Sequence, residues 1–420
     1  MNEAIGTRRC PVHFDHESAE HTTNWVAEFD AMREKYPVAW SDRHGGFWVA
    51  TSYDAVVRMA KDAESFSSHK HFDPATGHVE GGITIPATPI TRGLPVEADK
   101  PEWDAMRGFI NRRFAPKAVE SYRADARLYA TALLNRVIET GAMDLVNDFT
   151  GPVPAMVTMK LMGLPLHEWR QFADPLHTMV YTAKDAPNYA EVVGDVAWVF
   201  QRCAEEYARY LQEPEQDNLL SYFAHNDMDG RRLTLEEVLA FSNNIIIGGV
   251  DTTTALTTHA LAYLHDHPVE RERLLENPAM LPFAREEFLR FYSPIHGLAR
   301  NVAHDLEYDG IDMHKGDRVF LAWAAANRDP DVFAKPHAID MARPSNRHVA
   351  FGSGIHRCIG SNFARMMFEE MMAEIFARIP DFEIDYENSR RYPSVGTING
   401  WETMPIRFAP GSRVECSMVL

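Results

Sequence analysis

One stretch of the chain predicts a helix long enough to cross a whole domain. The run 234–237 (T-L-E-E) has the form of a capping box, in which Thr234 and Glu237 satisfy each other's backbone N–H groups at a helix start. The next strong stop signal is Pro268, because proline cannot continue a helix. The helix would then hold roughly 30 residues and measure about 45 Å, enough to span a compact domain.

The middle of this predicted helix is unusual, because Gly248 and Gly249 stand side by side there. Each glycine costs a helix interior about 1 kcal/mol relative to alanine. Their missing side chains would open a groove for a diatomic ligand or a substrate. Asp251 and Thr252 follow directly and supply an acid and a hydroxyl that can relay protons to a buried oxygen. The structural alternative is a packed kink in which Thr252 bonds to the carbonyl four residues earlier.

A single cysteine lies in a glycine-rich run, F-G-S-G-I-H-R-C-I-G, over residues 351–360. Gly352 and Gly354 allow backbone conformations that let a planar macrocycle approach the main chain. Cys358 would lie just before a helix at 361–378, where unpaired N–H groups stabilise a sulfur anion. One thiolate suggests haem iron. The alternative is a small buried cysteine in a glycine-rich turn.

The spacing F-G-x-G-x-H-x-C-x-G resembles the haem-binding signature of the cytochrome P-450 superfamily, and all six fixed positions match. The run G-G-x-D-T-T similarly resembles the oxygen-activation motif of that family. The resemblance implies haem b with Cys358 as the thiolate ligand of iron, within a loop that contains Phe351 and Gly352. It places Gly248, Asp251 and Thr252 on the opposite face of the haem, where oxygen is bound and protonated.

A pair of opposite charges, Glu287 and Arg290, falls three residues apart and thus on one helix face. Such a pair on an exposed helix contributes only about 0.3 kcal/mol and has no functional meaning. The pair also resembles the E-x-x-R element of the family, which an arginine shortly before the cysteine loop completes. Arg343 occupies that position. The implied role is structural, a buried network of charges that holds the cysteine loop in shape.

Haem carries two propionates, so its pocket needs cationic or N–H donors. Arg107, Arg300 and His356 occupy positions that resemble the propionate-binding ones of the family. Trp103 stands where the family commonly has a histidine. An indole N–H still donates one hydrogen bond but carries no charge. We therefore expect haem binding with one altered propionate contact; the alternative for Trp103 is core packing.

Composition agrees with a large soluble enzyme. Hydrophobic residues make up 45% of the 420, yet no run of 18 apolar residues exists and the N-terminus lacks a signal-peptide pattern. We expect a cytoplasmic monomer that does not bind membranes. The four cysteines, at positions 10, 203, 358 and 416, have no zinc or disulfide spacing.

The formal charge of −18 argues against nucleic-acid binding. A local basic face remains possible on the cysteine side of the haem, and it could dock an acidic electron donor. The alternative is that these side chains are ordinary solvated or propionate-pairing arginines. The residues expected there are Arg112, Arg113, Arg343, Arg347, His348, Arg357 and Arg365.

The predicted fold class is mainly α with a small β portion (α+β), a single large domain over residues 1–420 with the cytochrome P-450 fold and the long helix crossing the haem. Helical patterns cover 117–140, 145–163, 188–213 and 361–378. Short strands are predicted at 38–40 and 46–51, as a hairpin, and within 295–321 and 382–408. Residues 72–95 are rich in glycine, proline and threonine and predict a long loop, which in the family covers the substrate.

The candidates for substrate contact are chosen only by their position in the sequence. They are mostly apolar, which suggests that the substrate is a hydrophobic small molecule. His296 and Asn399 could add polar anchors. Each candidate is as compatible with packing as with ligand contact. The set consists of Ile83, Ile85, Met179, Val180, Ile247, Ile295, His296, Leu298, Ile398 and Asn399.

The predicted function is a haem-thiolate monooxygenase that inserts one oxygen atom from O2 into a hydrophobic organic molecule, by hydroxylation or O-dealkylation. Electrons must come from outside, since the chain has no dinucleotide fingerprint and no ferredoxin-like cysteine cluster. The resemblance implies a ferredoxin or flavodoxin that is fed from NAD(P)H by a reductase. The alternatives are a peroxide-driven haem-thiolate enzyme, against which Asp251 and Thr252 argue, and a non-catalytic haem sensor.

Overall fold

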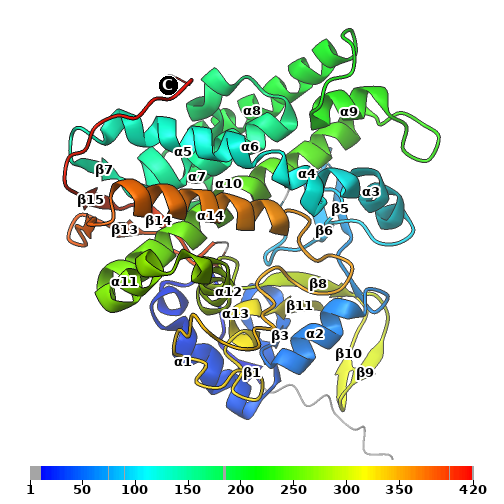
Figure 1. The fold of residues 1–420 in the computed structure, drawn as a ribbon. Helices are drawn as coiled ribbons and strands as arrows, with labels where there is room; N and C mark the ends of the chain where they lie inside the picture. Colours follow the sequence, from blue (N-terminus) through cyan, green and yellow to red (C-terminus); the bar gives the residue numbers. More distant parts are fainter. Residues whose placement is uncertain (1–10, 74, 89, 183–185, 397, 419–420) are drawn as a thin grey trace, which may run out of the picture.

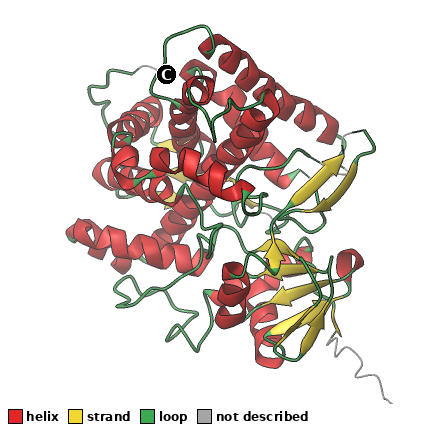
Figure 2. Ribbon diagram, turned by 90° about the vertical axis from the view of Figure 1, so that its right-hand side faces the viewer, coloured by secondary structure: helices red, strands yellow, loops and turns green. Residues whose placement is uncertain are grey.

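The computed structural model describes residues 11–73, 75–88, 90–182, 186–396 and 398–418. Helices form the larger part of the molecule, and a sheet with helices beside it forms the smaller part below it in Figure 1. Figure 2 shows the molecule from the side, with most of the strands in its right-hand half. The predicted class, mainly α with a small β portion, is confirmed.

The principal helices have the following bounds: α1 Ala19–Lys35, α2 Tyr53–Lys61, α3 Glu102–Asn111, α4 Pro116–Glu120, α5 Arg123–Val137, α6 Pro152–Met162, α7 Trp169–Tyr181, α8 Tyr189–Tyr210, α9 Leu219–His225, α10 Leu235–Asp266, α11 Pro268–Glu276, α12 Leu281–Tyr292, α13 Trp323–Ala326 and α14 Ser361–Arg378. None of the helices in the described ranges is long and apolar enough to cross a membrane.

The main sheet runs in the order β1-β2-β3-β11-β8-β4 and mixes parallel with antiparallel pairs. Its strands are β1 Pro11–Val12, β2 Val38–Ser41, β3 Phe47–Ala50, β11 Arg318–Leu321, β8 Leu298–Val302 and β4 Phe66–Ser67. The predicted hairpin is confirmed as β2 and β3, with Trp40 opposite Trp48. Smaller sheets pair β5 Lys70–Asp73 with β6 His78–Gly81, β9 Leu306–Tyr308 with β10 Ile311–Met313, and β13 Arg390–Arg391 with β14 Trp401–Thr403. A further sheet joins β12 Glu383–Ile384, β15 Pro405–Arg407 and β7 Ala142–Asp144.

The long helix is confirmed as α10, with 32 residues. The hydroxyl of Thr234 accepts the Glu237 N–H at 3.2 Å, and the Glu237 carboxylate accepts the Thr234 N–H at 2.8 Å, which is the predicted capping box. The helix contacts α6, α7, α8, α12 and α14, so most of the helical part of the molecule packs around it.

The two glycines in α10 have different surroundings. A Cβ on Gly249 would lie 2.6 Å from the hydroxyl oxygen of Thr158 on α6, so this glycine lets the two helices approach. A Cβ on Gly248 would meet no atom within 4 Å, and this glycine borders open space. The hydroxyl of Thr252 donates to the Gly248 carbonyl at 3.0 Å, the bond that the structural alternative predicts. One glycine therefore serves packing, and the other leaves room beside Thr252.

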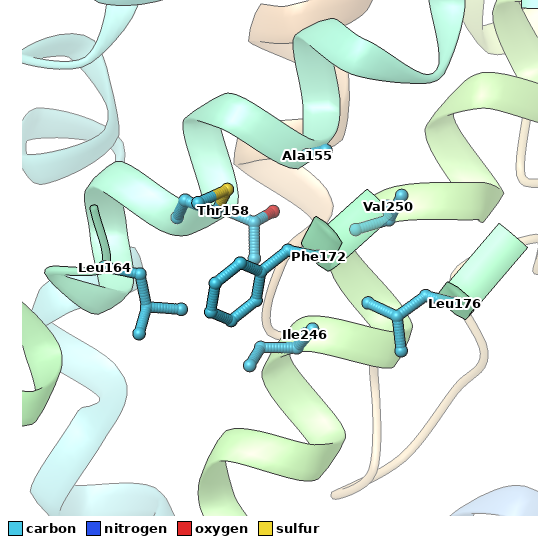
Figure 3. Close-up of a pocket in the computed structure, with 8 residues that line it drawn as sticks. Ala155, Thr158, Leu164, Phe172, Leu176, Ile246 and Val250 are labelled. Atoms are coloured by element: carbon cyan, nitrogen blue, oxygen red, sulfur yellow. The ribbon is translucent and has the colours of Figure 1, made fainter. Parts of the chain in front are cut away.

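Helices α6 and α7 meet α10 along an apolar seam, shown in Figure 3. Phe172 and Leu176 of α7 and Ala155 of α6 surround Ile246 and Val250 of α10. The remaining gap has a volume of only about 10 Å³. Since this is at most the room for one water and the lining is apolar, the seam is close-packed.

Two of the predicted helices are interrupted. The prediction for 117–140 is wrong at Ser121 and Tyr122, where α4 ends and α5 begins, because the chain turns to bury the Tyr122 ring against Phe363. The prediction for 145–163 is confirmed as helical, although its start is a different type of helix. There a π-helical turn, Val146–Thr150, precedes α6, since the prolines at 152 and 154 have no N–H to donate to an α-helical partner. The helices predicted over 188–213 and 361–378 are confirmed as α8 and α14.

The loop predicted for 72–95 begins inside a hairpin, so that prediction is wrong for its first part. Strands β5 and β6 pair in antiparallel register, with Phe72 opposite Val79. The carboxylate of Asp73 accepts the Ala75 N–H, and Gly77 has a φ of 71°, so an aspartate and a glycine build the turn. Residues 82–88 and 90–95 contain no helix or strand, as predicted; residues 74 and 89 lie outside the described part.

A buried charge network connects α12 to the chain before the cysteine loop. Arg290 donates two hydrogen bonds to the Glu287 carboxylate, at 2.8 and 2.9 Å, and Arg343 donates two more, at 3.0 and 3.1 Å. The side chain of Asn346 and the backbone N–H of Asp340 complete the contacts to Glu287. The three predicted members therefore meet, and Glu287 and Arg290 are fully buried.

The pKa of Glu287 reflects two opposing effects. Burial raises it, but hydrogen bonds from Arg290 and Arg343 outweigh burial and leave the pKa below the usual value of 4.5. A carboxylate whose pKa is lowered by folding contributes stability above its unfolded pKa. That contribution is lost as the pH falls through the lower, folded pKa.

We expect Glu287→Gln to lower the free energy of unfolding by about 3–5 kcal/mol, because two buried guanidinium groups lose their counter-charge. Chemical denaturation at pH 7, followed by circular dichroism, measures the change. The difference between this variant and the wild type should be constant above pH 5 and shrink below the usual glutamate pKa.

The control is Glu270→Gln, which removes a surface pair with Arg273 at 3.5 Å. Such pairs contribute about 0–1 kcal/mol. Equal destabilisation by the two substitutions would contradict the role of the buried network.

Candidate active site

The cysteine loop folds flat between α2 and α14. Gly352 and Gly354 both have φ of 71°, a left-handed conformation that favours glycine. A Cβ on Gly354 would collide with the Ala60 carbonyl oxygen at the end of α2. The backbone N–H of Cys358 donates to the Phe351 carbonyl at 2.8 Å and closes the loop. Both glycines are thus required by the local geometry, as the sequence predicted.

The thiol of Cys358 lies two residues before the N-cap of α14, Gly360. Burial raises its pKa, while a hydrogen bond from the Gly360 backbone and the charges of Arg107, Arg357 and Arg365 oppose that rise. Nearby cations and helix N–H groups favour a thiolate. The net effect still raises the pKa, so the group is a thiol in this structure; the cations and N–H groups reduce the cost of forming the thiolate that a metal would bind.

Four donors gather beside this loop with hydrogen-bonding capacity to spare. The indole N–H of Trp103, on α3, and both ring nitrogens of His356 are buried without a partner. The Trp103 and His356 rings lie 5.9 Å apart, edge to face. Arg107 and Arg300 contribute charge, and neither forms an ion pair within the described ranges. Such a set of unsatisfied donors calls for an anionic, many-oxygen partner.

The electrostatics of this group of donors have a common cause. Burial lowers the pKa of Arg300 to about 10, and burial together with the charges of Arg300 and Arg107 lowers the pKa of His356 to about 3. His356 is therefore a neutral donor, and the arginines are cations that burial makes costly without a counter-charge. The two propionates of haem supply that charge, so the residues present fit this cofactor. Trp103 also packs against the main core, so its contact with a propionate stays a prediction.

Asp251 of α10 has partners that the sequence analysis did not identify. Its carboxylate accepts hydrogen bonds from His177 of α7 at 2.8 Å and from the Tyr392 hydroxyl at 2.6 Å. His177 precedes Asp251 by 74 residues and Tyr392 follows it by 141. A local spacing pattern cannot predict a contact between residues so far apart in the sequence. The contact is therefore known only from the tertiary structure.

The predicted substrate contacts divide into two groups. His296 is 0% exposed and packs against Trp25 of α1, with ring centroids 4.4 Å apart. The amide of Asn399 is engaged by Arg391 and by the Tyr292 carbonyl, and Ile85 is buried with the aromatic cluster of α1 and the sheet. All three side chains are buried here, and their contact with a substrate stays a prediction.

Among the other candidates, Ile398 is as buried as Ile85, and its contact with a substrate likewise stays a prediction. Ile398 packs with Val180 and with Ala255 of α10, one turn beyond Asp251. Ile247 is exposed next to Gly248. Four further side chains are neither fully buried nor fully exposed, and their role stays a prediction: Ile83, Met179, Ile295 and Leu298.

The predicted basic face is smaller than expected, because carboxylates neutralise several of its members. Glu286 accepts hydrogen bonds from both His348 and Arg365, Arg343 belongs to the Glu287 network, and Arg113 pairs with Asp217. The exposed arginines of the set that form no ion pair within the described ranges are Arg112, Arg347 and Arg357.

Comparisons with known proteins agree with this geometry. The family model described as Cytochrome P450 matches residues 9–391. Erythromycin C-12 hydroxylase of Saccharopolyspora erythraea is 31% identical over 386 residues, which cover 89% of this chain and 92% of the relative. Methyl-branched lipid omega-hydroxylase of Mycobacterium tuberculosis is 29% identical, over 87% of this chain and 84% of the relative.

Solved structures show the same similarity in three dimensions. The crystal structure of CYP109E1 from Bacillus megaterium in complex with testosterone superposes with a TM-score of 0.80 and 26% identity. It covers 93% of this chain and 100% of the other. The arrangement of helices around α10 is therefore the one that these enzymes have. The chain belongs to the cytochrome P450 family of haem-thiolate monooxygenases.

Proposed function

We propose that this monooxygenase uses Cys358 as the iron ligand and inserts oxygen into a hydrophobic small organic molecule, with electrons from a separate carrier. The single observation that carries the assignment is the group of donors beside the Cys358 loop: the unpartnered buried nitrogens of Trp103 and His356, together with the cations of Arg107 and Arg300, which form no ion pair within the described ranges. Haem supplies the activation of O2, which a thiolate ligand favours by donating electron density to iron. The protein has to bind and orient the haem, shape the pocket and deliver protons.

Proton delivery falls to Asp251 and Thr252. The Thr252 hydroxyl donates to the Gly248 carbonyl, so its oxygen keeps lone pairs that can accept a proton on the side of the open space at Gly248. Asp251 is one residue away and 3% exposed, in a place where a carboxyl group can act as a general acid. Retention of both groups favours the use of O2 over the peroxide-driven alternative.

The substrate we propose is apolar, and it is oxidised by hydroxylation or O-dealkylation. Ile247 precedes Gly248 on α10, and Met179 and Val180 follow His177, the partner of Asp251, on α7; all three are apolar. By their names, the relatives above hydroxylate erythromycin or a methyl-branched lipid, and the solved structure is a complex with testosterone. A panel of steroids, fatty acids and macrolides, screened by the spin-state change of the haem, tests this proposal.

A ferredoxin or flavodoxin, reduced by NAD(P)H through its own reductase, is the proposed electron donor. Arg112, Arg347 and Arg357 remain to attract its acidic surface, since the other basic residues of this face are paired. The sequence also predicts that the protein is cytoplasmic, monomeric and a single domain. These three statements stay predictions.

Replacement of the proposed ligand tests the assignment directly. We expect Cys358→His to lose the long-wavelength Soret band that thiolate ligation gives to the reduced carbon monoxide complex. Cys416→Ser, which changes a half-buried cysteine elsewhere, should keep that band. An unchanged spectrum in Cys358→His would exclude this residue as the ligand.

We expect Thr252→Ala to divert reducing equivalents to hydrogen peroxide and to lower product per NAD(P)H at least about 10-fold, since a positioned proton donor contributes roughly 10²–10⁴-fold. Thr252→Ser keeps the hydroxyl and serves as the matched control. Product analysis and a peroxide assay with a substrate from the panel give the ratio. Equal coupling in the alanine variant and the wild type would remove Thr252 from the proton pathway.

Charge reversal at the basic face should slow electron transfer. We expect Arg112→Glu and Arg347→Glu each to lower the second-order rate of reduction by a ferredoxin about 10-fold at low salt, with the difference fading at high salt. Arg136→Glu, at an exposed arginine of α5, is the control. Stopped-flow reduction measures the rates, and equal losses in all three variants would argue against a local docking face.

A further inference from the structure

The carboxylate of Asp251 is held from two sides by elements other than its own helix. The Nδ1 of His177, from α7, lies 2.8 Å from one carboxylate oxygen. The hydroxyl of Tyr392, directly after β13, donates to the other oxygen at 2.6 Å and lies 3.0 Å from the same Nδ1. Three distant parts of the chain thus meet at one proposed proton donor.

The hydrogen-bond partners of His177 determine its charge. Its Nε2 faces the Glu402 carbonyl oxygen at 3.3 Å, and its Nδ1 faces the Asp251 carboxylate. A carbonyl and a carboxylate only accept hydrogen bonds, and neutral imidazole carries a single N–H. With Asp251 ionised, both contacts are made together only when both ring nitrogens are protonated. The geometry therefore describes an imidazolium paired with a carboxylate.

The charges around His177 also favour its protonated form. Burial lowers the pKa of His177, but the hydrogen bond and charge of Asp251, the Glu402 carbonyl and Asp174 raise it above the usual 6.5. The rings of Tyr181 and Tyr392 complete its surroundings, with centroids 5.4 and 5.7 Å from the imidazole. A histidine with a raised pKa keeps its proton below that pKa and loses it as the pH rises through it.

Helix α7 is well fixed for this contact. Its residues Phe172 and Leu176 pack against Ile246 and Val250 of α10, as Figure 3 shows, and His177 and Asp251 are the next residues along the two helices. The His177 side chain is 12% exposed and that of Asp251 4%, so the ring is the more accessible of the two to solvent protons.

We propose that His177 supplies Asp251 with the proton that it passes toward Thr252, while Tyr392 holds the carboxylate in line for the transfer. This inference rests on the proposed function of Asp251. The proton leaves Nδ1 of the imidazolium and binds the carboxylate oxygen 2.8 Å away. The neutral ring that remains keeps its Nε2–H on the Glu402 carbonyl, and a proton from water restores the cation. His177 is in this sense a positioning residue that acts through Asp251.

Titration of His177 in the reduced carbon monoxide form, by NMR of ¹⁵N-histidine-labelled protein, tests the charge without turnover. The signal is assigned by its loss in His177→Phe. We expect a pKa above 6.5 that falls in Asp251→Asn. A pKa below 6.5 in the wild type would overturn the proposal.

Turnover provides the second test, with NADPH, saturating spinach ferredoxin and its reductase as surrogate electron donors. We expect His177→Phe, which keeps a ring in place, to oxidise NADPH about 10-fold more slowly at pH 7. The wild-type rate should fall as the pH rises through the pKa of His177, the variant should lack this step, and added imidazole should restore part of its rate. Tyr181→Phe, which removes a hydroxyl from the same cluster, is the control with a wild-type rate and profile.

The outcomes separate the two proposals. A wild-type rate and peroxide yield in Asp251→Asn would overturn the proton pathway itself. If Asp251→Asn oxidises NADPH slowly but His177→Phe does so at the wild-type rate, the proton pathway stands and the role of His177 is overturned. A slow His177→Phe that keeps the wild-type pH step and gains nothing from imidazole would show a structural role only, which also overturns the inference.

Discussion

The close packing of α10 against its neighbours is the constraint on which the rest of the structure depends. At Gly249 the helix approaches α6 so closely that a single methyl group would meet the Thr158 hydroxyl. On another side it contacts α14, the helix that follows the cysteine loop. Helix α10 contacts both α6 and α14. These contacts fix the position of residues 248–252 relative to the loop that carries Cys358. Of the two glycines that weaken the helix, Gly249 allows the close approach to α6, and Gly248 leaves room beside Thr252.

The site combines two kinds of buried charge with opposite consequences. In the Glu287 network every charge has a partner, and the network holds the chain before the cysteine loop in place. Around the loop itself, Trp103 and His356 have buried nitrogens without a partner, and Arg300 is buried without an ion pair within the described ranges. A satisfied network favours rigidity, whereas unsatisfied donors favour an anionic ligand. We therefore interpret the Glu287 network as a structural support and the donors around the cysteine loop as a binding site.

Much of the fold follows from local signals. The capping box at Thr234, the stop before Pro268 and the run of helix formers after Gly360 predict α10 and α14 to within one residue. Errors arise where a long-range contact overrides a local pattern. Tyr122 turns inward to meet Phe363 and divides one predicted helix, and Asp73 with Gly77 forms a hairpin turn inside a predicted loop.

The sequence by itself determined the residues that need special backbone or special chemistry: Gly352 and Gly354, Cys358, Asp251 and Thr252, and the Glu287–Arg290 pair. These signals are local, since each depends on neighbours a few positions away. Only the tertiary structure decided which groups meet. It placed His177 and Tyr392 on Asp251, buried His296 against Trp25 and paired His348 and Arg365 with Glu286. The physical reason is that hydrogen bonds and desolvation act over a few ångströms in space, whatever the separation along the chain.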